Sequence, residues 1–375
     1  MTSKPVLGIM ALYWNDQKQL EEIRYFKQLS VLGRELGLSV IVFTPEDVDH
    51  SRMQIRSLIY DVRQGLWIRK WTPFPDVIFD RCRYQPNKRF EMLRKFRAKY
   101  PHLTYLNRPL ANKWIIHELF SDDSVLSGYL PDTKYYSDFS VLSRMLQKHK
   151  TVYFKPINGT GGRGILKIRG LGSKYVVQGR NHRRTIIRKQ VLTKPSLNLL
   201  MNRLLTARKY VVQQGIQIEL KDGRVHDFRI LIQKNSKGDW EYTGGACRIG
   251  PVQSITSNLH GGGRAIRMDS MLLRRFPKET AEKIKDSVEA LSLQAVHVLE
   301  KKYGQLCELA LDIAIDRHGK VYLLEINPKP AREVFRRIGD KEAYRRALLR
   351  PLEYALHVYQ SKHANQTADK KDNAS

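Results

Sequence analysis

The chain has 375 residues, of which 42% are hydrophobic, and 66 Lys and Arg against 37 Asp and Glu give a formal net charge of +29. This length allows about two or three domains with complete cores, and no apolar run approaches the roughly 18 residues of a membrane span. Cys82, Cys247 and Cys307 are odd in number and lack paired spacing, which excludes a disulfide framework or a zinc cluster as the organising principle. We therefore expect an intracellular protein that folds by packing.

The positive charge predicts attraction to polyanions, which include nucleic acid, nucleotides, acidic peptides and acidic macromolecular layers. The basic residues are spread along the whole chain, and the sequence has no helix-turn-helix, zinc-finger or aromatic single-strand-binding signature. We therefore expect no specific nucleic-acid partner, although a nucleic-acid binder remains an alternative.

The first part of the chain predicts an open α/β domain over residues 1–108, because strand and helix patterns alternate there. The expected strands cover residues 4–13, 38–43, 77–79 and 103–106, and the expected helices cover residues 17–36, 51–60 and 86–100. No Gly-x-Gly-x-x-Gly follows the first strand, so dinucleotide binding is not indicated. We expect this domain to act as a scaffold or to face a substrate.

Two lysines lie at the ends of expected elements in the middle of the chain. Lys113 lies near the start of a helix over residues 111–120. A helix over residues 139–149 leads to a strand over 151–154, and Lys155 follows that strand directly. Taken alone, Lys113 has the character of a solvated surface charge, whereas Lys155 is followed at once by a glycine-rich loop.

The glycine-rich loop departs from the Gly-x-x-x-x-Gly-Lys-Ser/Thr pattern of a P-loop, because no Lys-Ser or Lys-Thr follows it. Four of its six positions are glycines, which permit backbone torsions and close approach that side chains forbid. Successive N–H groups can therefore turn toward phosphate oxygens, and Lys155 can place an ammonium group on the same phosphates. The loop consists of Gly159, Thr160, Gly161, Gly162, Arg163 and Gly164.

Regular elements fill most of the remaining chain. A hairpin with a basic tip is expected over residues 173–192, and its charges are either solvated or recruit an acidic substrate. The other expected elements are helices over 198–209, 279–303 and 340–360 and strands over 225–232 and 240–249. Residues 363–375 have no apolar periodicity, so we expect a disordered tail there.

Two apolar runs around the turn residues 316–319 predict a β-hairpin with an acid in each strand. If the turn has two residues, Asp312 lies opposite Leu323, and alternation puts Glu325 and Asn327 on the same face. Both runs read as strands buried on both faces, where an unpartnered carboxylate is costly. Two carboxylates and an amide carbonyl could share one or two hard divalent cations, so this face predicts a metal site.

Taken together, Lys155, the glycine loop, Asp312 and residues 325–327 resemble the ATP-grasp superfamily over about residues 108–345. Further motifs look most like the YheC/YheD-type proteins associated with the endospore coat, and are similar to amino-acid-adding ligases that modify peptide or protein ends. These motifs are Gln213-Gln214-Gly215-Ile216, Asp227-Phe228-Arg229 and Ser257-Asn258-Leu259-His260-Gly261-Gly262-Gly263.

The resemblance implies an α/β protein with the ATP-grasp fold, in which two α+β subdomains grip ATP behind an open α/β N-terminal domain. We expect the N-terminal domain over residues 1–108. The subdomain with the lysine and the glycine-rich loop would cover residues 109–214, and the subdomain with the magnesium site residues 215–362.

The resemblance also assigns nucleotide-binding roles to residues at matching positions. Lys113 and Lys155 would hold the α- and β-phosphates of ATP, and the glycine loop would cover its β- and γ-phosphates. The hinge residues expected to meet the adenine edge are Gln213, Gln214 and Ile216. Glutamate is common where Gln214 stands, which leaves the ribose partner open, with Glu219 as the candidate.

Catalytic and metal roles follow from the same resemblance. Arg229 and Arg248 would face the triphosphate and the acylphosphate, because a guanidinium presents paired donors to phosphate or carboxylate oxygens. Asn258 and Gly262 belong to a second close-approach loop at the active centre. The expected ligands of Mg²⁺ are Asp312, Glu325 and Asn327.

These features predict an ATP- and Mg²⁺-dependent ligase that joins a carboxylate to an amine through an acylphosphate. The basic residues expected to border the cleft favour an acidic amino acid or peptide as the substrate. The alternative to an enzyme is a non-catalytic or nucleotide-binding structural protein of the spore coat. We expect the protein in the cytoplasm of the mother cell or in the spore coat, with coat components as partners and no membrane association.

Overall fold

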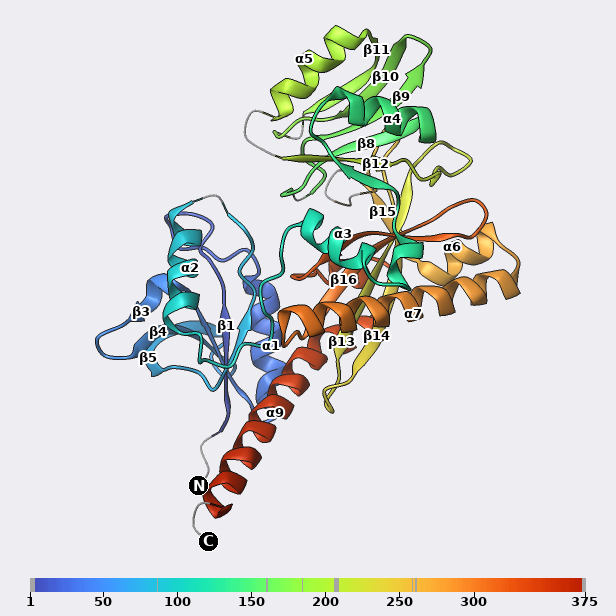
Figure 1. The fold of residues 1–375 in the computed structure, drawn as a ribbon. Helices are drawn as coiled ribbons and strands as arrows, with labels where there is room; N and C mark the ends of the chain where they lie inside the picture. Colours follow the sequence, from blue (N-terminus) through green and yellow to red (C-terminus); the bar gives the residue numbers. More distant parts are fainter. Residues whose placement is uncertain are drawn as a thin grey trace.

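The computed structural model describes residues 4–372 except 86, 160, 184, 206–208, 258, 260 and 261. The strands form three sheets, of six, six and five strands in chain order. Figure 1 shows the second sheet above the third, with the N-terminal domain to one side. Among the described residues, no helix combines the length and the apolar character needed to cross a membrane.

The N-terminal sheet has the strand order β3-β4-β2-β1-β6, with β5 paired to β4. The strand β1 runs parallel to its neighbours β2 and β6, as expected for an open α/β domain. The strands are β1 Val6–Met10, β2 Ser39–Phe43, β3 Val48–Asp49, β4 Gln54–Asp61, β5 Leu66–Pro73 and β6 Val77–Asp80. The helices are α1 Ile23–Glu35, the 3-10 helix η1 Pro45–Asp47 and α2 Lys88–Lys99.

Two predictions for this domain are wrong. The segment 51–60, expected to be helical, contains most of the strand β4, which forms an antiparallel hairpin with β5. Ile55 and Ser57 are fully buried whereas Gln54 and Arg56 are exposed, so burial alternates here as in a strand. The strand expected over residues 103–106 is reduced to an isolated bridge between Ile78 and Tyr105.

The second sheet has the strand order β11-β10-β9-β8-β12-β7 and includes the predicted basic hairpin as β10 and β11. Its strands are β7 Thr133–Tyr135, β8 Thr151–Pro156, β9 Ile165–Leu171, β10 Lys174–Arg180, β11 Ile186–Leu192 and β12 Tyr210–Gln214. The helices α4 Phe139–His149 and α5 Lys194–Leu205 share one apolar core with this sheet.

The third sheet is antiparallel, with the strand order β15-β14-β13-β16-β17. Its strands are β13 His226–Lys234, β14 Trp240–Ile249, β15 Arg264–Arg267, β16 Glu308–Ile315 and β17 Val321–Asn327. The helices α3 Lys113–Ser121, α6 Met268–Arg275 and α7 Lys278–Tyr303, with the 3-10 helix η2 Leu126–Tyr129, contribute to the core on one face. On the opposite face Leu231 and Ala246 pack near α8 Glu333–Arg337 and α9 Lys341–Asp372.

The hairpin of β16 and β17 differs in register from the prediction. Its turn has three residues, because the amide of Asp316 donates to the carbonyl of Lys320 at 3.0 Å. A bulge then interrupts the ladder, so that Asp312 pairs with Glu325 and not with Leu323. Each irregularity shifts the pairing by one residue, and two such shifts leave the acids on one face while bringing them directly opposite each other.

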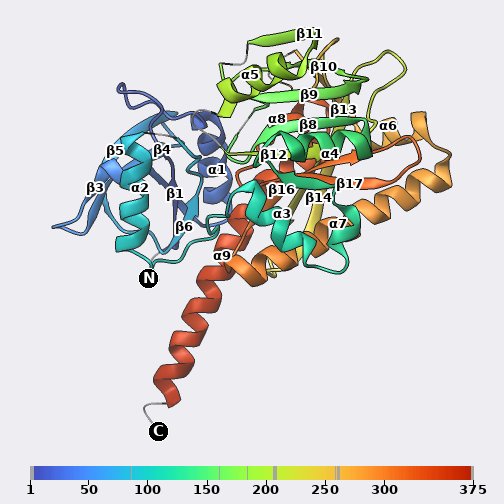
Figure 2. The ribbon, with the colours of Figure 1, turned by 45° about the horizontal axis from the view of Figure 1, so that its top comes forward.

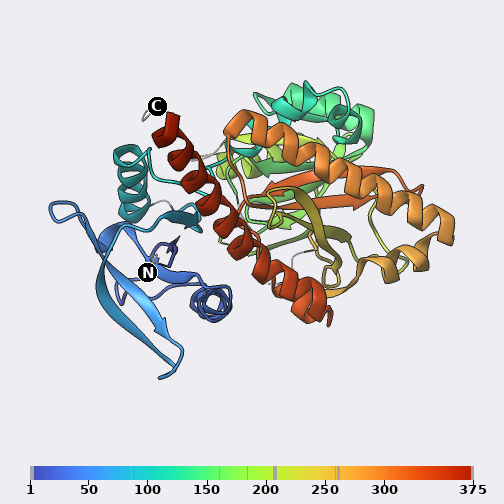
Figure 3. The same cartoon turned by 90° about the horizontal axis from the view of Figure 1, so that it is seen from below.

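Helix α9, near the end of the chain, packs against both the third sheet and the N-terminal domain. Figure 3 shows it passing between the N-terminal domain and the rest of the molecule. Ala343 and Ala347 pack under the third sheet, whereas Leu352, Tyr354 and Ala355 belong to a core of the N-terminal domain. The last helix is therefore part of two cores.

The end of α9 lies in the segment where a disordered tail is predicted. The helix continues to Asp372, so residues 363–372 are helical, and Figure 2 shows this end projecting from the body of the molecule. Extending a helix costs less than nucleating one, so the lack of apolar periodicity does not stop it. Residues 373–375 lie outside the described residues.

Replacing Leu352 with Ala should lower the free energy of unfolding by about 3 kcal/mol, because the fully buried side chain would leave a cavity in the N-terminal core. Denaturant titration followed by circular dichroism measures the change. The control Leu199→Ala, at a position on α5 that is 56% exposed, should cost less than about 0.5 kcal/mol. Equal losses in the two variants would contradict a contribution of α9 to the N-terminal core.

Candidate active site

A cavity of about 160 Å³ lies between the second and third sheets. Most of the predicted site residues line it. They are Lys113, Lys155, Gly159, Gly161, Gly162, Arg163, Gln213, Gln214, Ile216, Arg229, Arg248, Asp312, Glu325 and Asn327. The structure therefore brings the lysines, the glycine loop, the hinge, the arginines and the expected metal ligands to one place.

Some predicted residues are not brought to this cavity. Those that do not line it are Gly164, Glu219 and Gly262. The amide of Gly164 donates to the carbonyl of Asn181 at 3.1 Å, and the carboxylate of Glu219 pairs with the ammonium of Lys167 at 2.5 Å. The predicted residues outside the described part of the chain are Thr160 and Asn258.

The charged wall of the cavity comes from one face of the third sheet. Alternation along β13 puts Asp227 and Arg229 on the same face. Arg248 on β14 pairs in register with Asp227, and Asp312 on β16 pairs with Arg229. Glu325 on β17 pairs in turn with Asp312, so charged side chains form a row across four strands.

Asp312 lies at the centre of this row. Its Oδ1 accepts from Nε of Arg229 at 2.5 Å, and its Oδ2 lies 3.1 Å from Nη2 of both Arg229 and Arg248. Burial would raise the pKa of Asp312, but the two guanidinium groups outweigh burial and lower the pKa to about 2. The carboxylate is therefore ionised at neutral pH, as a metal ligand must be.

Arg248 is held between two carboxylates. Its Nε donates to Oδ1 of Asp227 at 2.7 Å and its Nη2 to Oδ2 at 2.5 Å. Burial would lower the pKa of Arg248, but Asp227 and Asp312 raise it above its ordinary value. No site role is predicted for Asp227 from the sequence, although its alternation with Arg229 on a buried strand indicates a shared face.

Lys155 extends from β8 into the opposite side of the cavity. Its Nζ donates to Oε1 of Gln213 at 2.6 Å, and Nε2 of Gln213 donates to Oγ1 of Thr133 at 3.1 Å. Burial, together with the charge of Lys113, lowers the pKa of Lys155 to about 8. An anion entering the cavity would favour the charged form of this lysine.

Lys113 is the first residue of α3, and its position follows from the helix cap. The side chain of Asn112 accepts hydrogen bonds from the amides of Trp114 and Ile115, which fixes where the helix begins. The side chain of Lys113 then reaches the strand β17, where its Nζ lies 3.2 Å from Oε1 of Glu325. A basic side chain thus approaches the cavity from the helix that packs against the third sheet.

The oxygen atoms of Asp312, Glu325 and Asn327 form a donor set suited to a hard cation such as Mg²⁺. Within the described structure, the buried Nδ2 of Asn327 has no hydrogen-bond partner, so this amide is not committed elsewhere. No cluster of three or more His, Cys, Asp or Glu side chains in the described ranges could hold a metal. The fit therefore depends on two carboxylates and one amide, and Mg²⁺ commonly completes its coordination with substrate phosphates and water.

The apolar part of the cavity was not predicted. Tyr153, Ile218, Ala314 and Leu324 line it together with the predicted Ile216. These are ordinary apolar or aromatic residues on or beside strands, so nothing in the sequence distinguishes them from the core. They form a surface that could accept a flat apolar ring.

Comparison with known proteins identifies a family and a relative. A family model described as YheC/D like ATP-grasp matches residues 102–358. The chain is 28% identical over 340 residues to the endospore coat-associated protein YheC of Bacillus subtilis (strain 168), which covers 90% of this chain and 91% of YheC.

Two solved structures share the fold at low identity. One is the D-alanine-D-alanine ligase from Coxiella burnetii, with a TM-score of 0.54, 11% identity and coverage of 98% of this chain and 99% of the ligase. The other is the ATP-grasp ligase PsnB in complex with a phosphomimetic variant of its minimal precursor, Mg and ADP, with a TM-score of 0.52, 12% identity and coverage of 95% and 99%. At these identities the likeness shows the fold alone, which is the ATP-grasp fold expected from the sequence.

Replacing Asp312 with Asn should destabilise the protein by about 3 kcal/mol, because Arg229 and Arg248 would lose a buried counter-charge. Replacing Glu325 with Gln should cost less than about 1 kcal/mol, because its partner Lys113 is more exposed. Both changes remove a ligand charge, so both should abolish the Mg²⁺-dependent rise in melting temperature with ADP. If that rise persisted in both variants, the metal site would lie elsewhere.

Proposed function

The chain belongs to the YheC/D like ATP-grasp family, and on that premise we propose that it is an ATP- and Mg²⁺-dependent ligase that joins a carboxylate to an amine. One observation carries the proposal: two lysines, a glycine loop and a row of charged side chains on the third sheet meet at one cavity. Each of these groups has chemistry suited to phosphate or to Mg²⁺.

The hinge end of the cavity would hold the adenine. The amides of Gln214 and Gly215 donate to the backbone carbonyls of Asp132 and Thr151 at 2.8 and 2.9 Å, so these amides serve the fold. Ile216 follows them and lines the cavity with Tyr153 and Leu324. We assign the adenine to this apolar surface, with the hinge backbone at its edge.

The phosphates would lie toward the glycine loop. Lys113 and Lys155 both line the cavity and would contact the α- and β-phosphates. Gly161 and Gly162 adopt φ values of 66° and 72°, a region that side chains disfavour and that turns successive amides toward one side. The loop would therefore cover the β- and γ-phosphates.

The reaction would proceed in two steps. A carboxylate oxygen attacks the γ-phosphorus, the bond from that phosphorus to the β–γ bridging oxygen breaks, and an acylphosphate and ADP form. An amine then attacks the acyl carbon, the bond from that carbon to the phosphate oxygen breaks, and the amine loses a proton as inorganic phosphate leaves.

The residues of the third sheet would serve this chemistry. Arg229 and Arg248 would neutralise the transferring phosphoryl group, with Asp227 orienting Arg248. Mg²⁺ held by Asp312, Glu325 and Asn327 would offset the charge of the phosphate oxygens.

We propose an acidic amino acid or peptide as the carboxylate substrate. Exposed basic residues lie on the edge strands of the two sheets that border the cavity, namely Arg188 and Lys189 on β11 and Arg264 and Arg267 on β15. With a net charge of +29, the chain would concentrate anions near the cavity.

The relative YheC is named for its association with the endospore coat, and we propose a role at the coat for this chain too. It would reach the coat after synthesis in the cytoplasm of the mother cell. Coat components would then be partners or substrates. A coat protein that keeps the nucleotide site without turnover is the alternative function, and it predicts binding of ATP without release of ADP.

Binding of Mg-ADP at pH 8 should take up about half a proton, because Lys155 is half neutral there in the free protein and phosphate raises its pKa. The uptake should vanish near pH 6, where Lys155 is already charged. Calorimetry in two buffers of different ionisation enthalpy measures the proton. Lys155→Met should bind more weakly and show no uptake, and equal uptake in both proteins would assign the proton to another group.

A panel of carboxylic acids and amines, each pair incubated with ATP and Mg²⁺, should reveal pairs that release ADP. Acidic amino acids and acidic peptides should react faster than neutral acids, and their rates should fall as salt screens the cavity. Glu325→Gln serves as the inactive control. Equal rates for neutral acids at every salt concentration would contradict the proposed substrate class, and ATP binding without ADP release from any pair would favour the structural alternative.

A further inference from the structure

A buried cluster of charged side chains joins the N-terminal domain to the third sheet, away from the cavity. We call it the interdomain cluster. Its members are Glu22, Asp80 and Arg81 of the N-terminal domain and Glu308, Lys329 and Arg332 of the last subdomain. None of these six side chains lines the cavity of the candidate active site.

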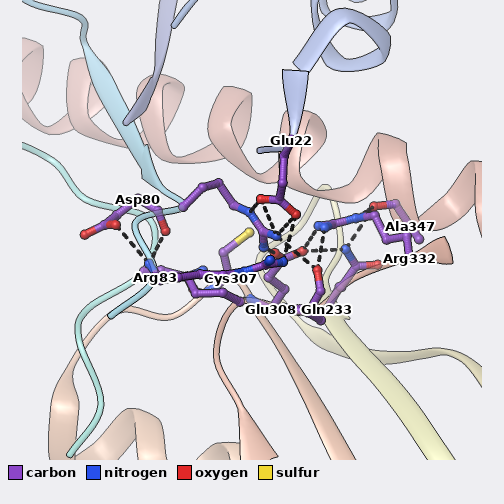
Figure 4. Close-up of polar contacts among 12 residues, drawn as sticks. Glu22, Asp80, Arg83, Gln233, Cys307, Glu308, Arg332 and Ala347 are labelled. Atoms are coloured by element: carbon purple, nitrogen blue, oxygen red, sulfur yellow. Dashed lines mark hydrogen bonds and ion pairs between the residues drawn. The ribbon is translucent and has the colours of Figure 1, made fainter. Parts of the chain in front are cut away.

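Glu308 is the point where the cluster meets the strand β16. Its carboxylate is fully buried and lies 2.7 Å from Nη1 of Arg81, and it also pairs with Arg332. Figure 4 shows Glu308 and Arg332 with Glu22 close by. Nη2 of Arg81 lies 2.8 Å from Oε1 of Glu22, which is the N-cap residue of α1. One guanidinium therefore links the start of α1, the end of β6 and the strand β16. Four residues along β16, the chain reaches Asp312.

Lys329 is the point where the cluster meets the end of β17. It lies two residues beyond Asn327, and its Nζ donates to the backbone carbonyl of Asp80 and lies 3.0 Å from Oδ1 of the same residue. The next carbonyl, that of Pro330, accepts from Nη2 of Arg81 at 3.1 Å and from Nη1 of Arg332 at 3.0 Å. The N-terminal domain therefore contacts the segment that follows β17, the strand that carries the candidate ligands Glu325 and Asn327.

Two charged residues of one domain thus hold both strands that carry candidate metal ligands. Buried ion pairs are a poor means of adding stability, because desolvation offsets most of their attraction. Their hydrogen bonds are directional, however, and they fix the relative position of the joined elements more tightly than an apolar contact would. A strand transmits such a position over a few residues because its backbone is extended and hydrogen-bonded to its neighbours, which are β13 and β17 for β16 and β16 for the edge strand β17.

We propose that the interdomain cluster sets the position of the magnesium ligands, with Asp80 and Arg81 of the N-terminal domain acting as positioning residues for Asp312 and Asn327. This inference rests on the proposed function, since it requires that Asp312, Glu325 and Asn327 hold Mg²⁺ with a nucleotide. The N-terminal domain would thus contribute to nucleotide binding although none of its described residues lines the cavity.

Asp80 offers a matched pair of variants. Its carboxylate contacts Lys329, which lies in the segment that follows β17. It also accepts from Nε of Arg97 at 2.9 Å, and Arg97 lies on α2 of the N-terminal domain itself. Lys329→Gln and Arg97→Gln each remove one cation from the same buried carboxylate. Both should lower the melting temperature, but only Lys329→Gln removes a contact between the N-terminal domain and the segment that follows β17.

The test is isothermal titration calorimetry of ADP with the full chain, with excess Mg²⁺ and with EDTA. Lys329→Gln should weaken binding of Mg-ADP about tenfold and should leave binding of ADP in EDTA unchanged. A tenfold loss is the lower end of the effect on metal affinity when groups that support metal ligands are changed. Arg97→Gln should bind like the wild type under both conditions.

Arg81→Lys is a second variant in case Lys329→Gln does not fold. It keeps a cation between Glu22 and Glu308 but removes the contact from Nη2 to the carbonyl of Pro330, so it should show the same loss limited to Mg²⁺. Normal Mg-ADP affinity in the folded variants, or equal losses in Lys329→Gln and Arg97→Gln, would overturn the inference. A wild-type chain that binds no nucleotide would instead overturn the proposed function itself.

Discussion

The carboxylate of Asp312, shared between the guanidinium groups of Arg229 and Arg248, is the interaction on which the rest of the site depends. It joins three neighbouring strands through their side chains and separates two cations that would otherwise repel each other. With Asp227 and Glu325 it balances most of the positive charge that the arginines and lysines bring to the cavity. The charged groups are therefore placed before any ligand arrives, and little reorganisation would be needed during reaction.

The same pairing sets a condition on metal binding. A cation at Asp312 must share this carboxylate with two guanidinium groups unless those groups find another anion. Phosphate oxygens offer arginine a negatively charged partner whose geometry is similar to that of a carboxylate. When Mg²⁺ and nucleotide bind together, the arginines would therefore turn to the phosphate while the carboxylate turns to the metal. The pair of Lys113 and Glu325 has the same character, since its ammonium suits phosphate and its carboxylate suits a metal.

Much of this arrangement could be predicted from sequence, because Lys155, the glycine loop and the two acids lie on separate elements in a recognisable order. The shared face of Asp312 and Glu325 was correct even though the register was wrong, because two one-residue shifts preserve the alternation. The bond from Arg229 to Asp312 could not be predicted, since it depends on the register of strands 83 residues apart. The strand β4 was missed for a similar reason, because its partner β5 and not its own pattern decides its conformation.

The contribution of α9 to the N-terminal core has a consequence for the order in which the chain folds. Domains made first on the ribosome usually fold first, while later segments are still being translated. Here Leu352, Tyr354 and Ala355 complete a core whose other members are mostly from the first 106 residues. The N-terminal domain can complete this core only after residue 355 has been synthesised, so during translation its unfinished apolar face is exposed to chaperones and to other nascent chains.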